Sequence, residues 1–268
     1  MRSILHVATH VFRDSVRDKV LYSIVAFAVI LMVSSFLIGQ LTAGQDVKII
    51  KDLGLAAMSL FGLFIAIFIG VGLVSREIER RSIYAVLAKP VRRHEFVIGK
   101  YFGLVGTLLA NLAVMAIAYY LVLEYMRFTM PPGQFTVSPA VVDPRLSIGI
   151  GMIAAELAVV TAVAVFWSTF SSSAMLSAAL TAGIWVAGQF GADLRNFDQV
   201  VKSPAAAALA RGLYYLLPNF AAFDVKSQVV HGLPVGADYI VVTLLYGAAY
   251  VAMLLTAAVF IFSRRDFK

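Results

Sequence analysis

Residues 53–75 read LGLAAMSLFGLFIAIFIGVGLVS, an apolar run without a single charged side chain. A helix needs about 20 such residues to cross the hydrocarbon core of a bilayer. Five further runs of comparable character occur, so the six expected membrane spans cover about residues 20–41, 53–75, 98–123, 148–169, 174–192 and 239–262. The sequence therefore predicts an all-α polytopic membrane protein, with six transmembrane helices in a single domain over residues 1–268.

The composition agrees with this prediction and excludes several kinds of chemical site. Hydrophobic residues make up 61% of the chain and charged residues 14%, whereas a soluble domain is roughly half apolar and about a quarter charged. The chain contains no cysteine, which excludes disulfides, thiolate metal sites and cysteine nucleophiles. The four histidines are scattered (His6, His10, His94 and His231), and no Asp pair or Ser-His arrangement converges in the sequence. We therefore expect no catalytic residue, no metal site and no cofactor in this chain.

The distribution of basic residues predicts the orientation. With the N-terminus inside, the cytosolic segments hold 14 Lys and Arg and the longer outer segments hold 8. Positive charge retains a loop in the cytoplasm, so both termini are expected to be cytosolic, in a bacterial inner membrane. Nucleic acid is not an expected partner, because no basic domain studded with aromatic residues carries the charge.

Two segments outside the spans have helical patterns. Residues 1–19 place Leu5, Ala8 and Phe12 at helical spacing, which predicts an amphipathic helix on the inner leaflet; the alternative is a solvated start of the first span. In the outer segment, residues 193–238, Ser203-Pro204 begins an apolar stretch that stops before Pro218. That stretch is too short to span. It predicts a re-entrant or interfacial helix, or else a helix packed on the outer surface.

The loop between the second and third spans carries the most specific pattern. Residues 77–103 read EIERRSIYAVLAKPVRRHEFVIGKYFG. Glu77 and Arg81 form an i,i+4 acid–base pair on an amphipathic helix, and Pro90 ends that helix. A charged cytosolic loop held between two spans, residues 76–97, is suited to docking a soluble partner. The alternative is a basic loop that only fixes the topology.

A resemblance to a known family favours the docking interpretation of this loop. The loop resembles the intracellular coupling loop of type-2 ABC transporter permeases, and the residues that carry the likeness are Glu77, Glu79, Leu87, Lys89-Pro90, Phe96 and Gly99-Lys100. Residues 165–173 (VFWSTFSSS) resemble the turn at the cytosolic end of the fourth span of these permeases. Residues 216–219 (LLPN), Phe223-Asp224 and the closing residues 264–267 resemble the permease group for multicopper-enzyme maturation.

The resemblance implies the membrane subunit of an ATP-driven exporter. The chain lacks a Gly-x-x-x-x-Gly-Lys-Ser/Thr loop, so ATP and Mg are expected on a separate ABC ATPase, present in two copies. A second copy of the permease would complete a homodimer surrounded by membrane lipid. The residues expected to dock the ATPase are Glu77, Glu79, Arg80, Arg81, Tyr84, Leu87, Arg92 and Arg93.

Polar residues inside the spans are further candidates. Glu156 lies within the fourth span and Asn111 midway along the third, where it is a possible hydrogen-bond partner of Glu156. Glu156 either lines a translocation path or pins two helices together, because an intramembrane charge is costly unless it is paired. Gly99 and Gly103 form a G-x-x-x-G pair, typical of close helix contact.

Two other functions compete with the exporter. A lipid-modifying membrane enzyme would need clustered Asp, His or Glu at the membrane surface. A proton-coupled secondary carrier would need several intramembrane ionisable groups or broken helices.

Overall fold

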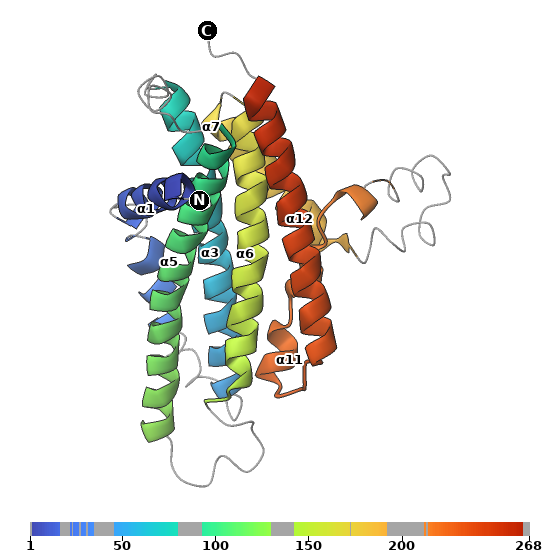
Figure 1. The fold of residues 1–268 in the computed structure, drawn as a ribbon. Helices are drawn as coiled ribbons and strands as arrows, with labels where there is room; N and C mark the ends of the chain where they lie inside the picture. Colours follow the sequence, from blue (N-terminus) through green and yellow to red (C-terminus); the bar gives the residue numbers. More distant parts are fainter. Residues whose placement is uncertain are drawn as a thin grey trace.

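The computed structural model describes residues 2–16, 22, 24–26, 28–30, 32–34, 46–79, 93–129, 142–171, 173–191, 212 and 214–264. Within this part the chain is helical (Figure 1). The elements are α1 (Arg2–Val16), α3 (Asp46–Glu79), α5 (Arg93–Thr129), α6 (Arg145–Phe170), α7 (Ala174–Gln189), the 3-10 helix η2 (Phe220–Phe223), α11 (Lys226–Val230) and α12 (Ala237–Arg264).

Four of these helices are long and apolar enough to cross a membrane. The candidate spans are Val47–Val71, His94–Phe128, Arg145–Phe170 and Ala237–Arg264, which correspond to the expected second, third, fourth and sixth spans. Six spans are not confirmed. The first expected span falls largely outside the described residues. The fifth is the 16-residue helix α7, which extends about 24 Å at 1.5 Å per residue and is shorter than a bilayer core.

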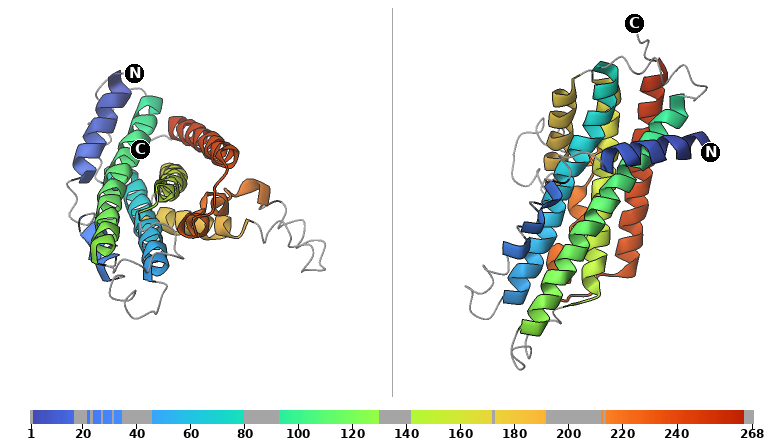
Figure 2. Two further views of the ribbon diagram at one scale, coloured as in Figure 1. Left: turned by 90° about the horizontal axis from the view of Figure 1, so that it is seen from below. Right: turned by 90° about the vertical axis from the view of Figure 1, so that its left-hand side faces the viewer.

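The helix α6 occupies the centre of the bundle, and Figure 2 shows α3, α5, α7 and α12 arranged around it. Small residues bring α3 against α6. A Cβ at Gly70 would lie 2.5 Å from the Ala164 Cβ, and one at Gly62 would overlap the Leu157 side chain. Loss of these glycines would therefore force the two central helices apart.

A tight turn joins α6 to α7, as the three or four residues between the predicted runs 148–169 and 174–192 require. The helix α6 ends at Phe170 and α7 begins at Ala174. Ser173 caps α7, because its hydroxyl oxygen accepts a hydrogen bond from the Leu176 N–H at 3.4 Å. Because Ser173 caps α7 directly, the chain reverses its direction here without a longer loop.

The amphipathic helix α1 lies across α5 (Figure 1). Its Val11 and Ser15 are buried, and its Leu5 is 68% exposed. The G-x-x-x-G pair forms the contact: a Cβ at Gly99 would lie 2.8 Å from the Val7 Cβ, and one at Gly103 2.7 Å from the Ala8 carbonyl oxygen. The pair thus confirms the expectation of close helix contact, and its partner is α1.

Alanine at Gly103 is expected to loosen α1, because its Cβ would collide with a backbone oxygen that cannot turn aside. Overpacking of this kind costs about 1–3 kcal/mol. The measurement is the rate at which a maleimide labels a Ser15→Cys reporter in this cysteine-free chain. Gly106→Ala on the same helix is the control, because its Cβ would meet Phe12 at an ordinary 3.4 Å. Equal labelling of the two variants would contradict the docking of α1 by Gly103.

The short α7 shares its place in the bundle with η2 and α11. In Figure 1, α7 lies toward one end of the bundle and α11 toward the other, and both α7 and α11 contact α3 and α6. The segment containing η2 and α11, residues 216–230, is called the inserted segment below. It fills the part of the bundle that α7 is too short to reach.

Candidate functional site: a polar cluster where alpha 7 ends

The end of α7 abuts the start of the inserted segment. Gly188 allows this contact, because a Cβ there would overlap the Pro218 carbonyl oxygen and would lie 2.5 Å from the Phe220 ring. A Cβ at Gly191 would lie 2.8 Å from Asn219 Oδ1. Two helical pieces thus meet inside the bundle through irregular backbone, whose polar groups need partners away from water.

Tyrosines of α12 supply several of those partners. The Tyr239 hydroxyl donates to the Ala222 carbonyl at 2.7 Å, and the Asn219 N–H donates to the Tyr246 hydroxyl at 2.9 Å. The Tyr250 hydroxyl donates to the Leu216 carbonyl. The three side chains follow one another along α12, so a single helix binds the inserted segment over its irregular part.

Glu156 lies beside this junction. It is 2% exposed, and it is 11 residues after the first residue of α6, about 16 Å along the helix at the usual rise. Its Oε1 accepts hydrogen bonds from Trp185 Nε1 and Gln189 Nε2 of α7, each at 2.9 Å. Glu156 therefore joins α6 to the last two turns of α7.

Asn111, the partner suggested for Glu156, does not bind Glu156 in the structure. Its Nδ2 donates to the Thr107 carbonyl of its own helix at 2.8 Å. An asparagine in a helix readily turns back onto a carbonyl four residues earlier, which satisfies it without a second helix. The helix that Glu156 pairs with is α7, which follows it directly in the chain.

The inserted segment adds charge to the cluster. Lys226, the first residue of α11, places Nζ 3.5 Å from Ser59 Oγ of α3 and 3.5 Å from Asp224 Oδ1. The polar cluster thus has two parts. Glu156 binds Trp185 and Gln189, and Lys226 binds Ser59 and Asp224. Together the two parts draw on α3, α6, α7 and the inserted segment.

A second polar group lies where α3 begins. Lys51 is fully buried, the Tyr119 hydroxyl donates to its carbonyl at 3.3 Å, and the charges of Lys51 and Asp143 act on each other. The Arg145 guanidinium donates to the Gly232 carbonyl. Gly232, in the turn after α11, has φ 70°, a conformation that suits glycine. Its hydrogen bond with Arg145 connects this turn to the start of α6.

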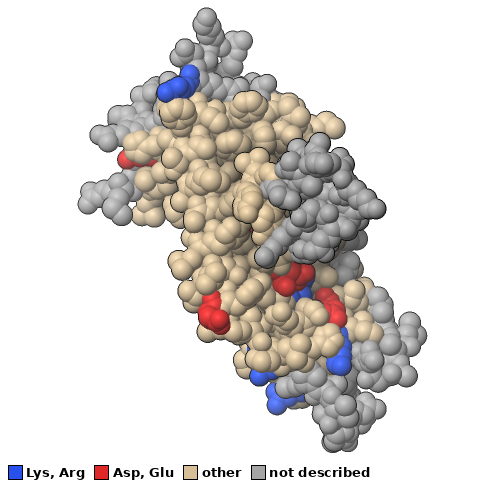
Figure 3. Space-filling view, turned by 90° about the vertical axis from the view of Figure 1, so that its right-hand side faces the viewer, with Lys and Arg blue, Asp and Glu red and all other residues tan. Residues whose placement is uncertain are grey.

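The charged side chains on one face of the molecule gather toward its two ends (Figure 3). A band without Lys, Arg, Asp or Glu lies between them among the described residues. This pattern is typical of a helical bundle surrounded by lipid, with charges in the two interfacial layers.

The structure describes few of the predicted docking residues. Glu77 and Glu79 belong to the last turn of α3, and Arg93 is the first residue of α5. The remaining members lie outside the described residues: Arg80, Arg81, Tyr84, Leu87 and Arg92. The helix α3 continues 8 residues beyond the apolar span that ends at Val71. The predicted docking loop therefore follows a helix that continues past the apolar span without a break.

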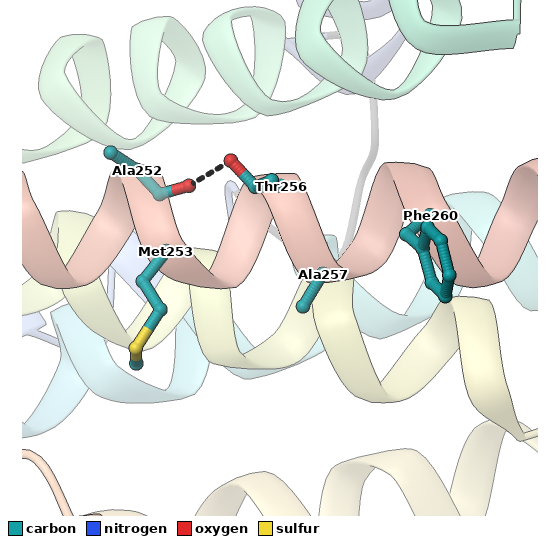
Figure 4. Close-up of a pocket in the computed structure, with 5 residues that line it drawn as sticks. All are labelled: Ala252, Met253, Thr256, Ala257 and Phe260. Atoms are coloured by element: carbon teal, nitrogen blue, oxygen red, sulfur yellow. Dashed lines mark hydrogen bonds between the residues drawn. The ribbon is translucent and has the colours of Figure 1, made fainter.

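A groove on α12 is lined by no charged side chain. Ala252, Met253, Thr256, Ala257 and Phe260 line it, all from one helix (Figure 4). The Thr256 hydroxyl donates to the Ala252 carbonyl at 2.7 Å, so the groove presents an apolar surface. In the part of the chain that the structure describes, no three His, Cys, Asp or Glu side chains gather as metal ligands.

Sequence reasoning did not identify most of the polar cluster. Trp185 and Gln189 lie one helical turn apart near the end of an apolar run. This spacing predicts that both side chains share one helix face, and it would have pointed to them if α7 had been expected to pack against Glu156. Lys226 offers no such signal. It was assigned to the outer segment, and its contact with Ser59 spans 167 residues of sequence.

The family model described as ABC-2 family transporter protein matches residues 5–267. Among curated proteins, none matches the chain.

Proposed function

The chain belongs to the ABC-2 transporter family, and from this premise we propose that it is the permease subunit of an ATP-driven exporter. It is a multi-pass membrane protein and the membrane component of an ABC-2 type transporter. Members of the family are transmembrane subunits without ATPase domains, so ATP is hydrolysed by a partner. The match over nearly the whole chain is the observation that carries this proposal.

In the proposed transporter, two ATPase subunits serve two copies of the permease, and the loop around residues 80–92 receives each ATPase. Two features support this role. The helix α3 carries the loop beyond the apolar span without interruption, and α5 resumes at Arg93. Motion imposed on the loop would therefore reach both helices. Tyr84 and Leu87 would insert into the ATPase, and the surrounding arginines would add salt-sensitive contacts.

The orientation belongs to the same proposal. With the loop facing an ATPase in the cytoplasm of a bacterial cell, α11 and the start of α12 lie on the outer side of the inner membrane. The helix α1 supports this orientation, because it crosses α5 six to ten residues after Arg93 and exposes the apolar Leu5 beside the polar His6 and His10. An amphipathic helix there would lie in the inner interface.

We also place the chain in the permease group for multicopper-enzyme maturation. The support is the sequence of residues 216–224, LLPNFAAFD, together with its structure. Those residues form the irregular part of the inserted segment and η2. In this proposal they form the re-entrant element of that group, on the outer side of the bundle.

The competing functions have less support. The junction between α7 and the inserted segment is the kind of broken element that secondary carriers use. The family match nevertheless carries more weight, because it covers residues 5–267.

Co-purification with a candidate ABC ATPase tests the proposal. The permease in lipid nanodiscs should retain the ATPase and alter its rate of ATP hydrolysis, and compounds that are exported should raise this rate further. A cysteine in place of Gln134 should react from outside the cell, which reports the orientation independently. If the ATPases tested neither bind nor respond, the exporter assignment is wrong.

A further inference from the structure

Among the four candidate spans, α12 is covered least by the rest of the chain. Of its most apolar stretch 11% is buried, against 67% for α6 and 78% for α3. Three of its four buried residues, Thr243, Gly247 and Ala258, are small, and the fourth is Phe262. Helices that meet through small side chains interlock little, so they slide along one another in shear motions. The packing of α12 on α6 therefore opposes a lengthwise shift of α12 only weakly.

The last turn of α12 is attached to the first turn of α5. Phe262 stacks on Phe96, with ring centroids 5.8 Å apart and an interplanar angle of 21°, and both side chains are buried. The Lys100 Nζ lies 4.5 Å from the centre of the Phe96 ring. Phe96 is three residues after Arg93, where α5 begins directly after the predicted docking loop. A displacement of that loop would therefore reach α12 through this ring stack.

The other half of α12 is attached to the inserted segment. From Tyr239 through Tyr246 to Tyr250, the backbone groups that the three hydroxyls bind run from residue 222 back to residue 216. The irregular chain thus lies antiparallel to α12, whose length and position in the bundle are seen in Figure 1. Gly247 adds a close contact, because a Cβ there would lie 3.0 Å from the Phe223 ring.

We propose that α12 is a lever that couples the docking loop to the inserted segment. The helix is continuous from Ala237 to Arg264 and contains no proline, so a lengthwise shift of one end displaces the other. The 23 residues from Tyr239 to Phe262 extend about 35 Å at 1.5 Å per residue. A shift of the first turn of α5 would move Phe262, and the tyrosines would carry the inserted segment with α12. That an ATPase drives the shift rests on the proposed function, whereas the coupling itself belongs to the permease.

The permease alone, in lipid nanodiscs, tests the coupling through maleimide labelling of Val229→Cys. Val229 is fully buried on α11, and a Cβ at Gly149 of α6 would lie 3.7 Å from its side chain. Phe262→Leu breaks the ring stack and keeps an apolar side chain, so α12 should shift more freely and labelling should rise at least about threefold. Phe96→Leu removes the same stack from the α5 side and should have the same effect.

The tyrosine hydroxyls separate this route from one through α6, which contacts α5, α11 and α12. Replacing Tyr239, Tyr246 and Tyr250 together with phenylalanine removes three hydrogen bonds and keeps the rings. This change should speed labelling about tenfold, because the segment is no longer bound to α12. Phe262→Leu should then add nothing. If the two effects multiply, the stack and the tyrosines act independently and the lever is wrong; it is equally wrong if Phe262→Leu and Phe96→Leu both label like the parent.

Two controls separate a shift of α12 from general loosening. Phe260→Leu alters a ring of the same turn that is 54% exposed, and it should label like the parent. A Met115→Cys reporter, fully buried on α5, should stay unlabelled in every variant. Faster labelling in the first control, or labelling of Met115→Cys together with Val229→Cys, would overturn the lever. The measurements need no ATPase, so a permease that binds none would refute the exporter assignment and leave the coupling result intact.

Discussion

Replacing Glu79, Arg80 and Arg81 together with alanine is expected to detach the ATPase and stop transport, while the permease stays folded in the membrane. Exposed charge pairs contribute about 0.2–1 kcal/mol each, so three losses together should weaken binding by roughly threefold to 150-fold. Transport should fall further than binding, because the loop is carried on α3, which continues past the apolar span. Residual ATP hydrolysis should no longer respond to exported compounds. Binding is measured by titration in nanodiscs and transport in proteoliposomes.

The opposite end of α5 provides the matched control. Glu124 and Arg127 form an ion pair at 3.3 Å near the end of that helix, with both side chains partly exposed. Their replacement by alanine also removes charges from a helix end, but it should leave ATPase binding and transport unchanged. If the triple variant binds and transports like the parent at equal expression, residues 76–97 are not the docking loop.

Alanine at Gly188 is expected to disrupt the junction between α7 and the inserted segment. Its Cβ would overlap the Pro218 carbonyl oxygen and would lie 2.5 Å from the Phe220 ring. Neither neighbour yields easily, because the first is backbone and Phe220 is fully buried. Overpacking costs about 1–3 kcal/mol, and displacement of Gln189 would weaken the hydrogen bonds to Glu156 in addition. Thermal unfolding in nanodiscs should show a clearly lowered midpoint.

Gly183 on the same helix is the control for this substitution. A Cβ there would meet nothing within 4 Å. Both substitutions replace glycine with alanine inside a helix, which gains up to about 1 kcal/mol of helix propensity. Gly183→Ala should therefore unfold at the same temperature as the parent or a higher one. A Gly188→Ala variant as stable as Gly183→Ala would show that α7 does not depend on the close contact with Pro218.

Apolar runs and their spacing predicted α3, α5, α6 and α12, because a helix long enough to cross a bilayer must satisfy its backbone within itself. The same local reasoning extends to the amphipathic α1, the turn before Ser173 and the Gly99–Gly103 contact. It did not fix the length of α7. The apolar run 174–192 is long enough by composition, yet the helix ends at Gln189, so the fifth span is not confirmed.

The sequence by itself therefore determined the four long apolar helices and the class of the protein. The docking residues stay a prediction. Only the tertiary structure decided which polar groups meet. Glu156 was visible as a polar residue inside a span, but its hydrogen-bond partners Trp185 and Gln189 follow it by 29 and 33 residues and lie on another helix. Hydropathy and helical periodicity report how a segment partitions and which face it buries. The pairing of polar side chains depends on how distant segments pack, and no local pattern encodes that.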